Sequence, residues 1–215
     1  WKDYMVDMGF GYALGVDLPG EVRGMIPNAQ YYDKLYNKSW NGLTIISNSI
    51  GQGEITLTPL QIANLGATIA NRGYYITPHV VKQIEGAEID SLYSKKHYVN
   101  VSRENYELVV EGMRQSVLNG TCTAAATNLY EVCGKTGTAQ NRGKDHSVFM
   151  GFAPRENPQI AIAVYVENGG FGATYGVPIG ALMMEQYITG TLSEESEKKA
   201  EYYANRSIDY GDQTR

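Results

Sequence analysis

The feature that most constrains the fold is a run of apolar residues inside the segment Gln159–Glu167. Because no polar residue alternates with the apolar ones, the segment is typical of a strand that is covered on both faces. Two more strand-like segments precede it, at about Tyr130–Gln140 and His146–Phe152. The links between the three segments are short, so we expect them to form an antiparallel meander.

Three segments carry helical signals. The clearest begins at Thr58, whose hydroxyl can cap a helix, with Pro59 in the first turn, Gln61 completing a capping box and Gly73 closing the helix. The apolar residues expected on the inner faces of the other two helices are Tyr106, Val109, Met113 and Val117 within Ser102–Leu118, and Ile179, Leu182, Met183, Tyr187 and Ile188 from about Pro178 onward. An antiparallel sheet flanked by helices predicts an α/β chain of the α+β type.

The end of the first expected strand, Lys135-Thr136-Gly137-Thr138, combines an ammonium group and two hydroxyls around a glycine. Because side chains at a period of two share one face of a strand, Thr136 and Thr138 point together. Gly137 leaves room for a substrate backbone alongside. Charge-assisted hydrogen bonds contribute about 1.5–3 kcal/mol each, so this strand predicts a binding site for a carboxylate, such as the free C-terminus of a peptide.

Two alternatives compete with this interpretation. Chance alone places a Lys-Thr-Gly tripeptide in roughly one chain in twenty of this length. Gly134-Lys135-Thr136 could also end a phosphate-binding P-loop, but Leu129 occupies the position where that loop requires a glycine. The residues in between are strand-like, which argues against nucleotide binding.

Further sequence blocks accompany the tripeptide. They are Ile50-Gly51-Gln52-Gly53-Glu54, Thr58-Pro59-Leu60-Gln61-Ile62-Ala63, Asn71-Arg72-Gly73, His146-Ser147-Val148-Phe149-Met150-Gly151-Phe152-Ala153-Pro154 and Val166-Glu167-Asn168-Gly169-Gly170. In order and spacing, these blocks resemble the class B penicillin-binding transpeptidases over about residues 1–190. The segment Trp1–Gly24 is most similar to the elongation-type member of that family.

The resemblance implies a fold, a reaction and roles for residues. The fold is the C-terminal part of the penicillin-recognising serine transpeptidase and β-lactamase-like fold. The reaction is acyl transfer at the D-Ala-D-Ala end of a peptidoglycan stem peptide, which β-lactams inhibit by mimicry. Lys135 would supply positive potential, the hydroxyls of Thr136 and Thr138 would hold the carboxylate, and the Thr138 N–H would be an oxyanion donor. His146 and Ser147 are possible residues of the pocket rim, or polar residues at a sheet end.

The catalytic serine of this family should precede Lys135 in a Ser-x-x-Lys box, and no such box is there. The one Ser-x-x-Lys, Ser196 to Lys199, lies later in a charged run and is interpreted as a solvated helix face. A Ser-x-Asn at Ser39 to Asn41 lies too close to the Gly-Gln-Gly block, so both residues are interpreted as loop positions. We therefore expect the nucleophile outside this chain, which would be inert alone.

Composition sets further bounds. One domain is expected over residues 1–190, followed by a charged, mobile tail over residues 191–215. The net charge of −5 does not indicate the basic surface that binds nucleic acid. The longest apolar run is far shorter than the roughly 20 residues that span a bilayer. No metal or cofactor is implied. Cys122 and Cys133 are either buried apolar residues or, in the periplasm that the family implies, a disulfide pair.

The resemblance also implies a location and partners. The parent protein would act at the periplasmic face of the bacterial cytoplasmic membrane, held by an anchor outside this chain, with the cell-wall elongation machinery. The alternative is a non-catalytic module that binds peptides or partner proteins in that machinery. A β-lactamase or β-lactam sensor would share Lys-Thr-Gly, but the Gly-Gln-Gly and Thr-Pro-Leu-Gln blocks argue against it. We interpret Gly51-Gln52-Gly53 itself as a tight turn into a helix start.

Overall fold

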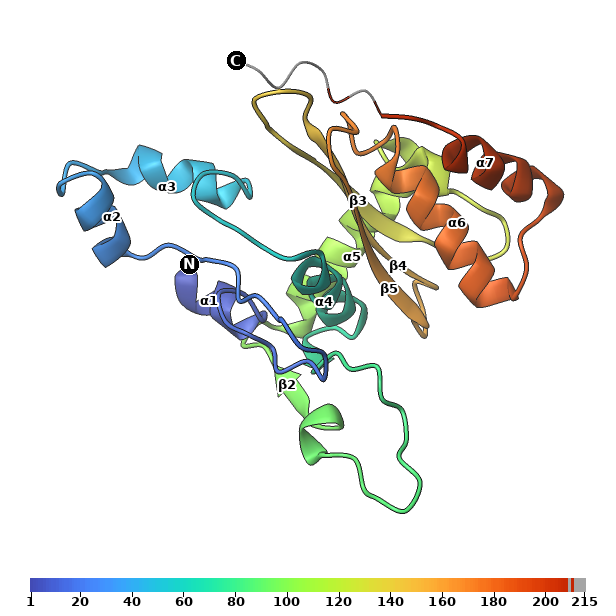
Figure 1. Cartoon of the computed structure of the whole chain (residues 1–215), viewed down its shortest axis with the longest axis horizontal. Coiled ribbons are helices and arrows are strands. Elements are labelled where there is room, and N and C mark those ends of the chain that lie inside the picture. The colour runs from blue at the N-terminus through green and yellow to red at the C-terminus, as the bar shows by residue number, and fades with distance from the viewer. Residues whose placement is uncertain (209, 211–215) are drawn as a thin grey trace.

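The chain is built around a three-stranded antiparallel sheet in a computed structural model, which describes residues 1–208 and residue 210 (Figure 1). Its strands are β3 (Cys133–Ala139), β4 (His146–Ala153) and β5 (Ile160–Val166), in the order β3-β4-β5. Lys135 lies opposite Met150 in the register. The expected meander is therefore confirmed. Within the described residues, β3 and β5 each pair along one edge only.

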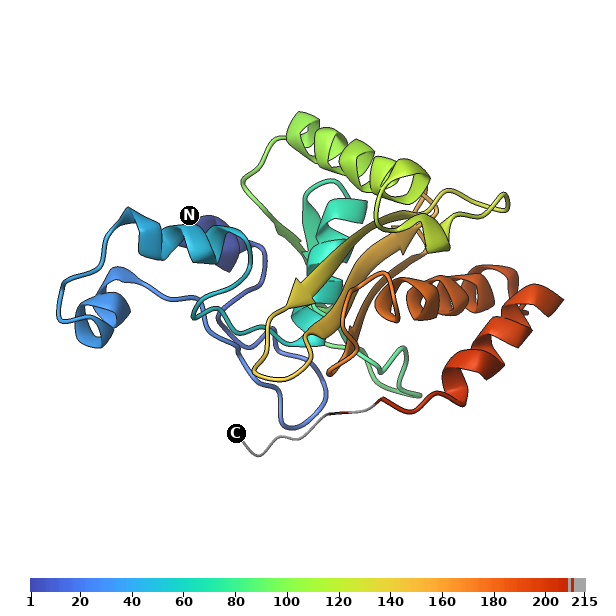
Figure 2. The same ribbon diagram turned by 90° about the horizontal axis from the view of Figure 1, so that it is seen from above.

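Helices cover both faces of this sheet (Figure 2). They are α4 (Pro59–Ala70) and α5 (Arg103–Asn119) on one face and α6 (Gly176–Thr189) on the other. Because neighbouring side chains of a strand point to opposite faces, Phe149 of β4 packs in the core beneath α6, whereas Phe152 packs with α4 and α5. Both α4 and α6 contact β5, which confirms that this apolar strand is covered on both sides.

Helix α4 begins as the sequence predicts. The Thr58 hydroxyl accepts a hydrogen bond from the Gln61 N–H at 3.1 Å, and the Gln61 side-chain oxygen accepts one from the Thr58 N–H at 3.0 Å. The buried Gln61 amide also donates to the carbonyls of Gly9, Tyr12 and Arg23. This single side chain therefore caps α4 and ties the N-terminal segment to it.

Helix α5 matches its expected range, but its inner face differs at one position. Val110 is 0% exposed and packs with Tyr106 and Met113, whereas Val109, which the sequence placed on the inner face, is 46% exposed. Either valine fits a helical stripe with its neighbours, because the helical period of 3.6 lies between three and four residues. The docking of α5 on β3 and α4 selects Val110.

Helix α6 shows a similar shift. Met184 is fully buried in the core between α6 and the sheet, whereas the predicted core residues Met183 and Tyr187 are exposed. Ile179 and Ile188 do pack against this core, as expected.

A helix, α7 (Glu194–Ala204), occupies most of the segment that the sequence analysis expected to be a mobile tail. It packs against α6, and Ser196 is buried between the two helices rather than on a solvated face. Its hydroxyl donates to Glu185 of α6 at 2.6 Å, and the Ser193 N–H donates to the same carboxylate. The boundary between residues 190 and 191 stays a prediction, and residues 209 and 211–215 lie outside the described residues.

The remaining elements are short. They are α1 (Lys2–Asp7), α2 (Ala29–Leu35), α3 (Gly42–Ser49), β1 (Tyr74–Ile76), β2 (Lys96–Tyr98) and the 3₁₀ turns η1 (Ser91–Tyr93) and η2 (Thr123–Ala125). Helices α2 and α3 project from the body in Figure 1. They are joined by Tyr32, whose hydroxyl donates to Glu54 at 2.9 Å and accepts from Asn48.

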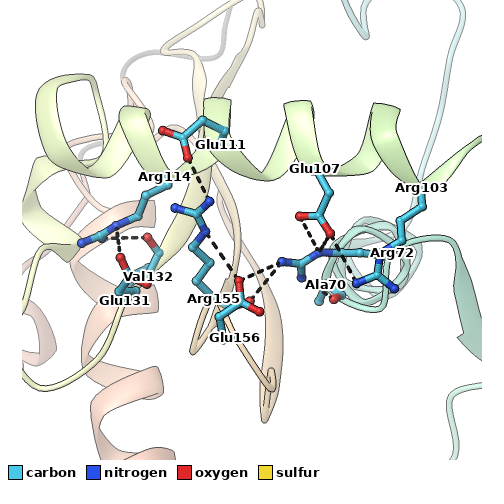
Figure 3. Close-up of polar contacts among 10 residues, drawn as sticks. All are labelled: Ala70, Arg72, Arg103, Glu107, Glu111, Arg114, Glu131, Val132, Arg155 and Glu156. Atoms are coloured by element: carbon cyan, nitrogen blue, oxygen red, sulfur yellow. Dashed lines mark hydrogen bonds and ion pairs between the residues drawn. The ribbon is translucent and has the colours of Figure 1, made fainter.

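Ion pairs tie the segment before β3 to the helical layer (Figure 3). Arg114 of α5 pairs with Glu131 at 3.3 Å and donates to the Val132 carbonyl at 3.1 Å. Arg155 in the β4–β5 turn pairs with Glu111 of α5 at 3.0 Å. The entry of β3 and the far end of β4 are therefore fixed to the same helix.

Cys122 and Cys133 are both free and buried, and burial raises the pKa of the Cys133 thiol to about 11. This agrees with the interpretation of the two cysteines as buried small residues. In the part of the chain that the structure describes, no helix has the length and apolar character needed to cross a membrane. No cluster of three or more histidine, cysteine or acidic side chains there could hold a metal ion.

Candidate active site

The candidate site is the outer edge of β3. Strand alternation places Thr136 and Thr138 on the α6 face, opposite Phe149 and Ser147 of β4, and Lys135 and Gly137 on the α4 face. Lys135 is exposed, and its ammonium group donates to the Thr136 carbonyl at 2.9 Å. The edge thus carries a cation on one side and two partly exposed hydroxyls on the other.

The hydroxyl of Thr136 has a partner that the sequence analysis did not identify. The side-chain oxygen of Thr121, in the segment between α5 and η2, lies 2.7 Å from that of Thr136. Thr121 is exposed and lies fifteen positions earlier in the chain. The Asn119-Gly120 helix stop was the available signal, because the chain must turn there before it returns to form β3.

The segment between β5 and α6 crosses the same face of the sheet. A Cβ atom on Gly172 would overlap the Val148 carbonyl oxygen and would lie 2.7 Å from the Gly137 carbonyl oxygen and 3.0 Å from Thr136 Cβ. Only a glycine permits the segment to lie this close to β3 and β4. Gly172 was not predicted as a site residue, because nothing in the sequence shows which glycine meets a neighbouring backbone.

The two possible rim residues hold this segment in place. Ser147 is 0% exposed, and its hydroxyl donates to the Phe171 carbonyl at 2.8 Å and accepts from the Gly176 N–H at 3.0 Å. The His146 ring nitrogen Nδ1 accepts from the Asn168 N–H at 3.0 Å. Both side chains make contacts that shape the β5–α6 segment, and a role for them at the pocket rim stays a prediction.

Several of the sequence blocks meet at one hollow of about 550 Å³. Gly51 and Gln52 line it together with Pro59 at the start of α4 and with Gly137 and Thr138 of β3. Gly51 and Gly53 have positive φ angles, as a tight turn requires, but the turn follows the end of α3, and α4 begins only at Pro59. Segments separated by more than eighty positions in the sequence therefore surround one end of the candidate edge.

The space for a side chain at Gly137 is limited by β4. A Cβ atom there would lie 3.2 Å from Val148 Cβ, on the α4 face. A larger residue would therefore press on β4 as well as fill space at the edge.

The late Ser-x-x-Lys does not form a catalytic pair. Ser196 donates its hydroxyl to Glu185, while Lys199 pairs with Glu195 at 2.7 Å. Both residues border a separate hollow of about 620 Å³ between α6, α7 and residues 124–130. A serine nucleophile requires a base that takes its proton, and here the carboxylate that receives the hydrogen bond anchors a helix. Burial raises the pKa of Glu185, but the hydrogen bonds from Ser196 and Ser193 outweigh burial and hold it below its usual range.

The Ser-x-Asn has a structural role. The Asn41 side chain accepts from the Leu43 N–H at 2.9 Å and caps α3, and Ser39 lies in the exposed link before it. Both residues are loop or cap positions, as interpreted.

The Lys-Thr-Gly-Thr strand thus lies at the edge of an antiparallel sheet with helices on both faces, as the resemblance to penicillin-recognising domains implies. The family model described as "Penicillin binding protein transpeptidase domain" matches residues 1–185. The chain belongs to this transpeptidase family.

Among curated proteins, the chain is similar to the peptidoglycan D,D-transpeptidase MrdA of Acinetobacter baumannii, with 37% identity over 80% of this chain and 29% of the relative. It is 31% identical to the MrdA protein of Haemophilus influenzae over 90% of this chain and 33% of the relative. The chain thus spans about a third of the length of these relatives.

Solved structures of penicillin-binding proteins have a similar fold. Penicillin-binding protein 2 of Pseudomonas aeruginosa superimposes with a TM-score of 0.77 and 35% identity, over 89% of this chain and 43% of that one. Penicillin-binding protein 2 of Helicobacter pylori, solved in complex with MreC, gives a TM-score of 0.73 at 28% identity, over 87% of this chain and 35% of that one.

Proposed function

We propose that this chain is the C-terminal half of a penicillin-binding D,D-transpeptidase site that cross-links peptidoglycan stem peptides. The observation that carries the proposal is the β3 edge, where exposed Lys135 and the hydroxyls of Thr136 and Thr138 lie along a strand with one unpaired side in the described residues. An ammonium group and hydroxyls beside an accessible strand edge suit a peptide that ends in a carboxylate.

Each residue has a defined task in the proposed reaction. Lys135 supplies positive potential, and the Thr136 and Thr138 hydroxyls bind the terminal carboxylate of D-Ala-D-Ala. A serine oxygen attacks the carbonyl of the penultimate residue, D-alanine leaves with a proton, and an amine of a second stem then displaces the serine. The Thr138 N–H donates to the oxyanion, and losing one such donor typically lowers the rate about 10²–10³-fold.

The serine itself is proposed to come from sequence outside this chain. The geometry of Ser196 supports this proposal, since its hydroxyl donates to Glu185 while the Lys199 ammonium group pairs with Glu195. Removing a catalytic serine costs on the order of 10⁶ in kcat where it has been measured. The chain alone should therefore be inactive.

The family also suggests a setting. MreC accompanies the Helicobacter pylori neighbour in its solved complex, and we propose a comparable elongation partner for the full-length protein. The proposed location is the periplasmic face of the cytoplasmic membrane, with an anchor outside this chain and β-lactams as inhibitors.

Intact-mass spectrometry after incubation with benzylpenicillin tests the function. The proposal expects one covalent adduct on the full-length protein and none on the chain of residues 1–215. A stoichiometric adduct on the short chain would contradict the placement of the nucleophile. No adduct on either form would contradict the transpeptidase proposal and favour a module that only binds peptides or partners.

A further inference from the structure

We infer that Thr121 is a positioning residue for carboxylate recognition, because its hydroxyl lies 2.7 Å from that of Thr136 and can set the direction of the Thr136 proton. This inference rests on the proposed function, since it concerns how the β3 edge holds an anionic ligand. Thr121 itself acts through Thr136.

The two residues that flank Thr121 fix its position. Gly120 follows the last turn of α5, and a Cβ atom there would lie 2.9 Å from Ser116 Cα, so the turn requires a glycine. On the other side, Cys122 is fully buried and donates its N–H to the Ser116 carbonyl at 3.0 Å. Thr121 is therefore held between a tight helix end and a buried anchor, beside β3.

The direction of the hydrogen bond between Thr121 and Thr136 determines whether the Thr136 proton can reach a ligand. A threonine hydroxyl carries one proton and two lone pairs, whereas an ionised carboxylate only accepts hydrogen bonds. If Thr136 donated to Thr121, its proton would be unavailable to the ligand. When Thr121 donates to Thr136, the Thr136 proton is free to point at the carboxylate. An anionic ligand therefore selects the order Thr121 to Thr136 to carboxylate.

This order also strengthens the contact with the ligand. A hydroxyl that accepts one hydrogen bond becomes a better donor of the next, because each bond in a chain polarises its neighbour. The effect should depend on the negative charge of the ligand. A ligand whose carboxylate is masked gains little from the arrangement.

The test uses the full-length protein and measures second-order acylation rates with benzylpenicillin and with its methyl ester, in which the carboxylate is masked. The variants are Thr121→Val, which keeps the shape without the hydroxyl, and Thr121→Ser, which restores the hydroxyl. Thr123→Val is a matched control, because Thr123 is an exposed threonine two positions later, at the start of η2. Thermal unfolding of each variant checks that the fold is intact.

We expect Thr121→Val to lower the rate with benzylpenicillin about two- to fourfold, because polarisation strengthens a charge-assisted hydrogen bond by roughly 10–30%, and to leave the rate with the ester unchanged. Thr121→Ser and Thr123→Val should both match the wild type, and Thr121→Val should add nothing in a Thr136→Val background.

Equal losses with the two ligands, no loss, or failure of serine to restore the rate would overturn the inference while leaving the proposed function intact. Absence of acylation in the wild-type protein would overturn both.

Discussion

The guanidinium nitrogen Nε of Arg72 lies 3.3 Å from a carboxylate oxygen of Glu107, which joins the end of α4 to α5 (Figure 3). Arg72 also donates to the Ala70 carbonyl at 2.7 Å and lies 3.6 Å from Glu156 in the β4–β5 turn. Its side chain is 6% exposed, so one buried cation links three elements around the sheet.

Replacing this cation should destabilise the fold. Because Glu107 and Glu156 keep some solvent contact, we expect Arg72→Ala to lower the free energy of unfolding by about 2–3 kcal/mol, less than for a fully buried pair. Urea denaturation measures the change. Arg103→Ala is the matched control, since Arg103 pairs with the same Glu107 but is 75% exposed, and it should cost about 0.5 kcal/mol or less. Equal effects of the two variants would contradict the assigned role of Arg72.

Gly172 should tolerate no side chain. The Cβ atom in Gly172→Ala would overlap the Val148 carbonyl oxygen, so we expect a fall in unfolding free energy of at least about 1–3 kcal/mol. Gly112→Ala is the control with the opposite sign: Gly112 lies inside α5 with open space around its Cβ position, and alanine there should stabilise by about 0.5–1 kcal/mol. Thermal unfolding compares them. A neutral Gly172→Ala would show that the β5–α6 segment does not lie against β3 as described.

The docking of α7 should depend on pH through Glu185. The hydrogen bonds that outweigh burial hold the pKa of this carboxyl below its ordinary value of 4.5. A lowered folded-state pKa contributes stability above the unfolded-state value, and this contribution is lost as pH falls through the folded-state pKa. Glu185→Gln should therefore destabilise the protein at pH 7, and the difference from the wild type should vanish in acid.

Urea denaturation over a pH series tests this expectation. Glu201→Gln, at an exposed position of α7, serves as the control and should show no comparable pH-dependent difference. A constant difference between wild type and Glu185→Gln at every pH would mean that the side chain acts through its shape rather than through its charge.

Local signals in the sequence predicted much of the fold. The capping residues Thr58 and Gln61 fixed the start of α4 because they act within one turn of the chain. The period of two placed Thr136 and Thr138 on one face of β3 for the same reason. For Val109 and Val110 the helical period allowed either residue to face inward, and tertiary packing buried Val110 rather than the predicted Val109.

The rest of the candidate site depends on contacts between distant segments. The pairing of Thr121 with Thr136 and the close approach of Gly172 arise from how loops cross the sheet. The periodicity of apolar residues in the sequence does not reveal contacts between distant segments. The docking of α7 on α6 was not predicted, because its charged sequence resembles a solvated helix face or a tail; the hydrogen bonds from Ser193 and Ser196 to Glu185 help to hold it there.

The β3 edge should act as half of a carboxylate-binding acylation site, and the acylation rate of the full-length protein by benzylpenicillin measures this. Loss of one charge-assisted group costs roughly 1.5–3 kcal/mol, so Lys135→Ala should lower this rate by about 10–150-fold with an unchanged melting temperature. Lys95→Ala, at an exposed lysine after η1, should leave the rate unchanged. Acylation of Lys135→Ala at the wild-type rate would show that the β3 edge does not bind the carboxylate.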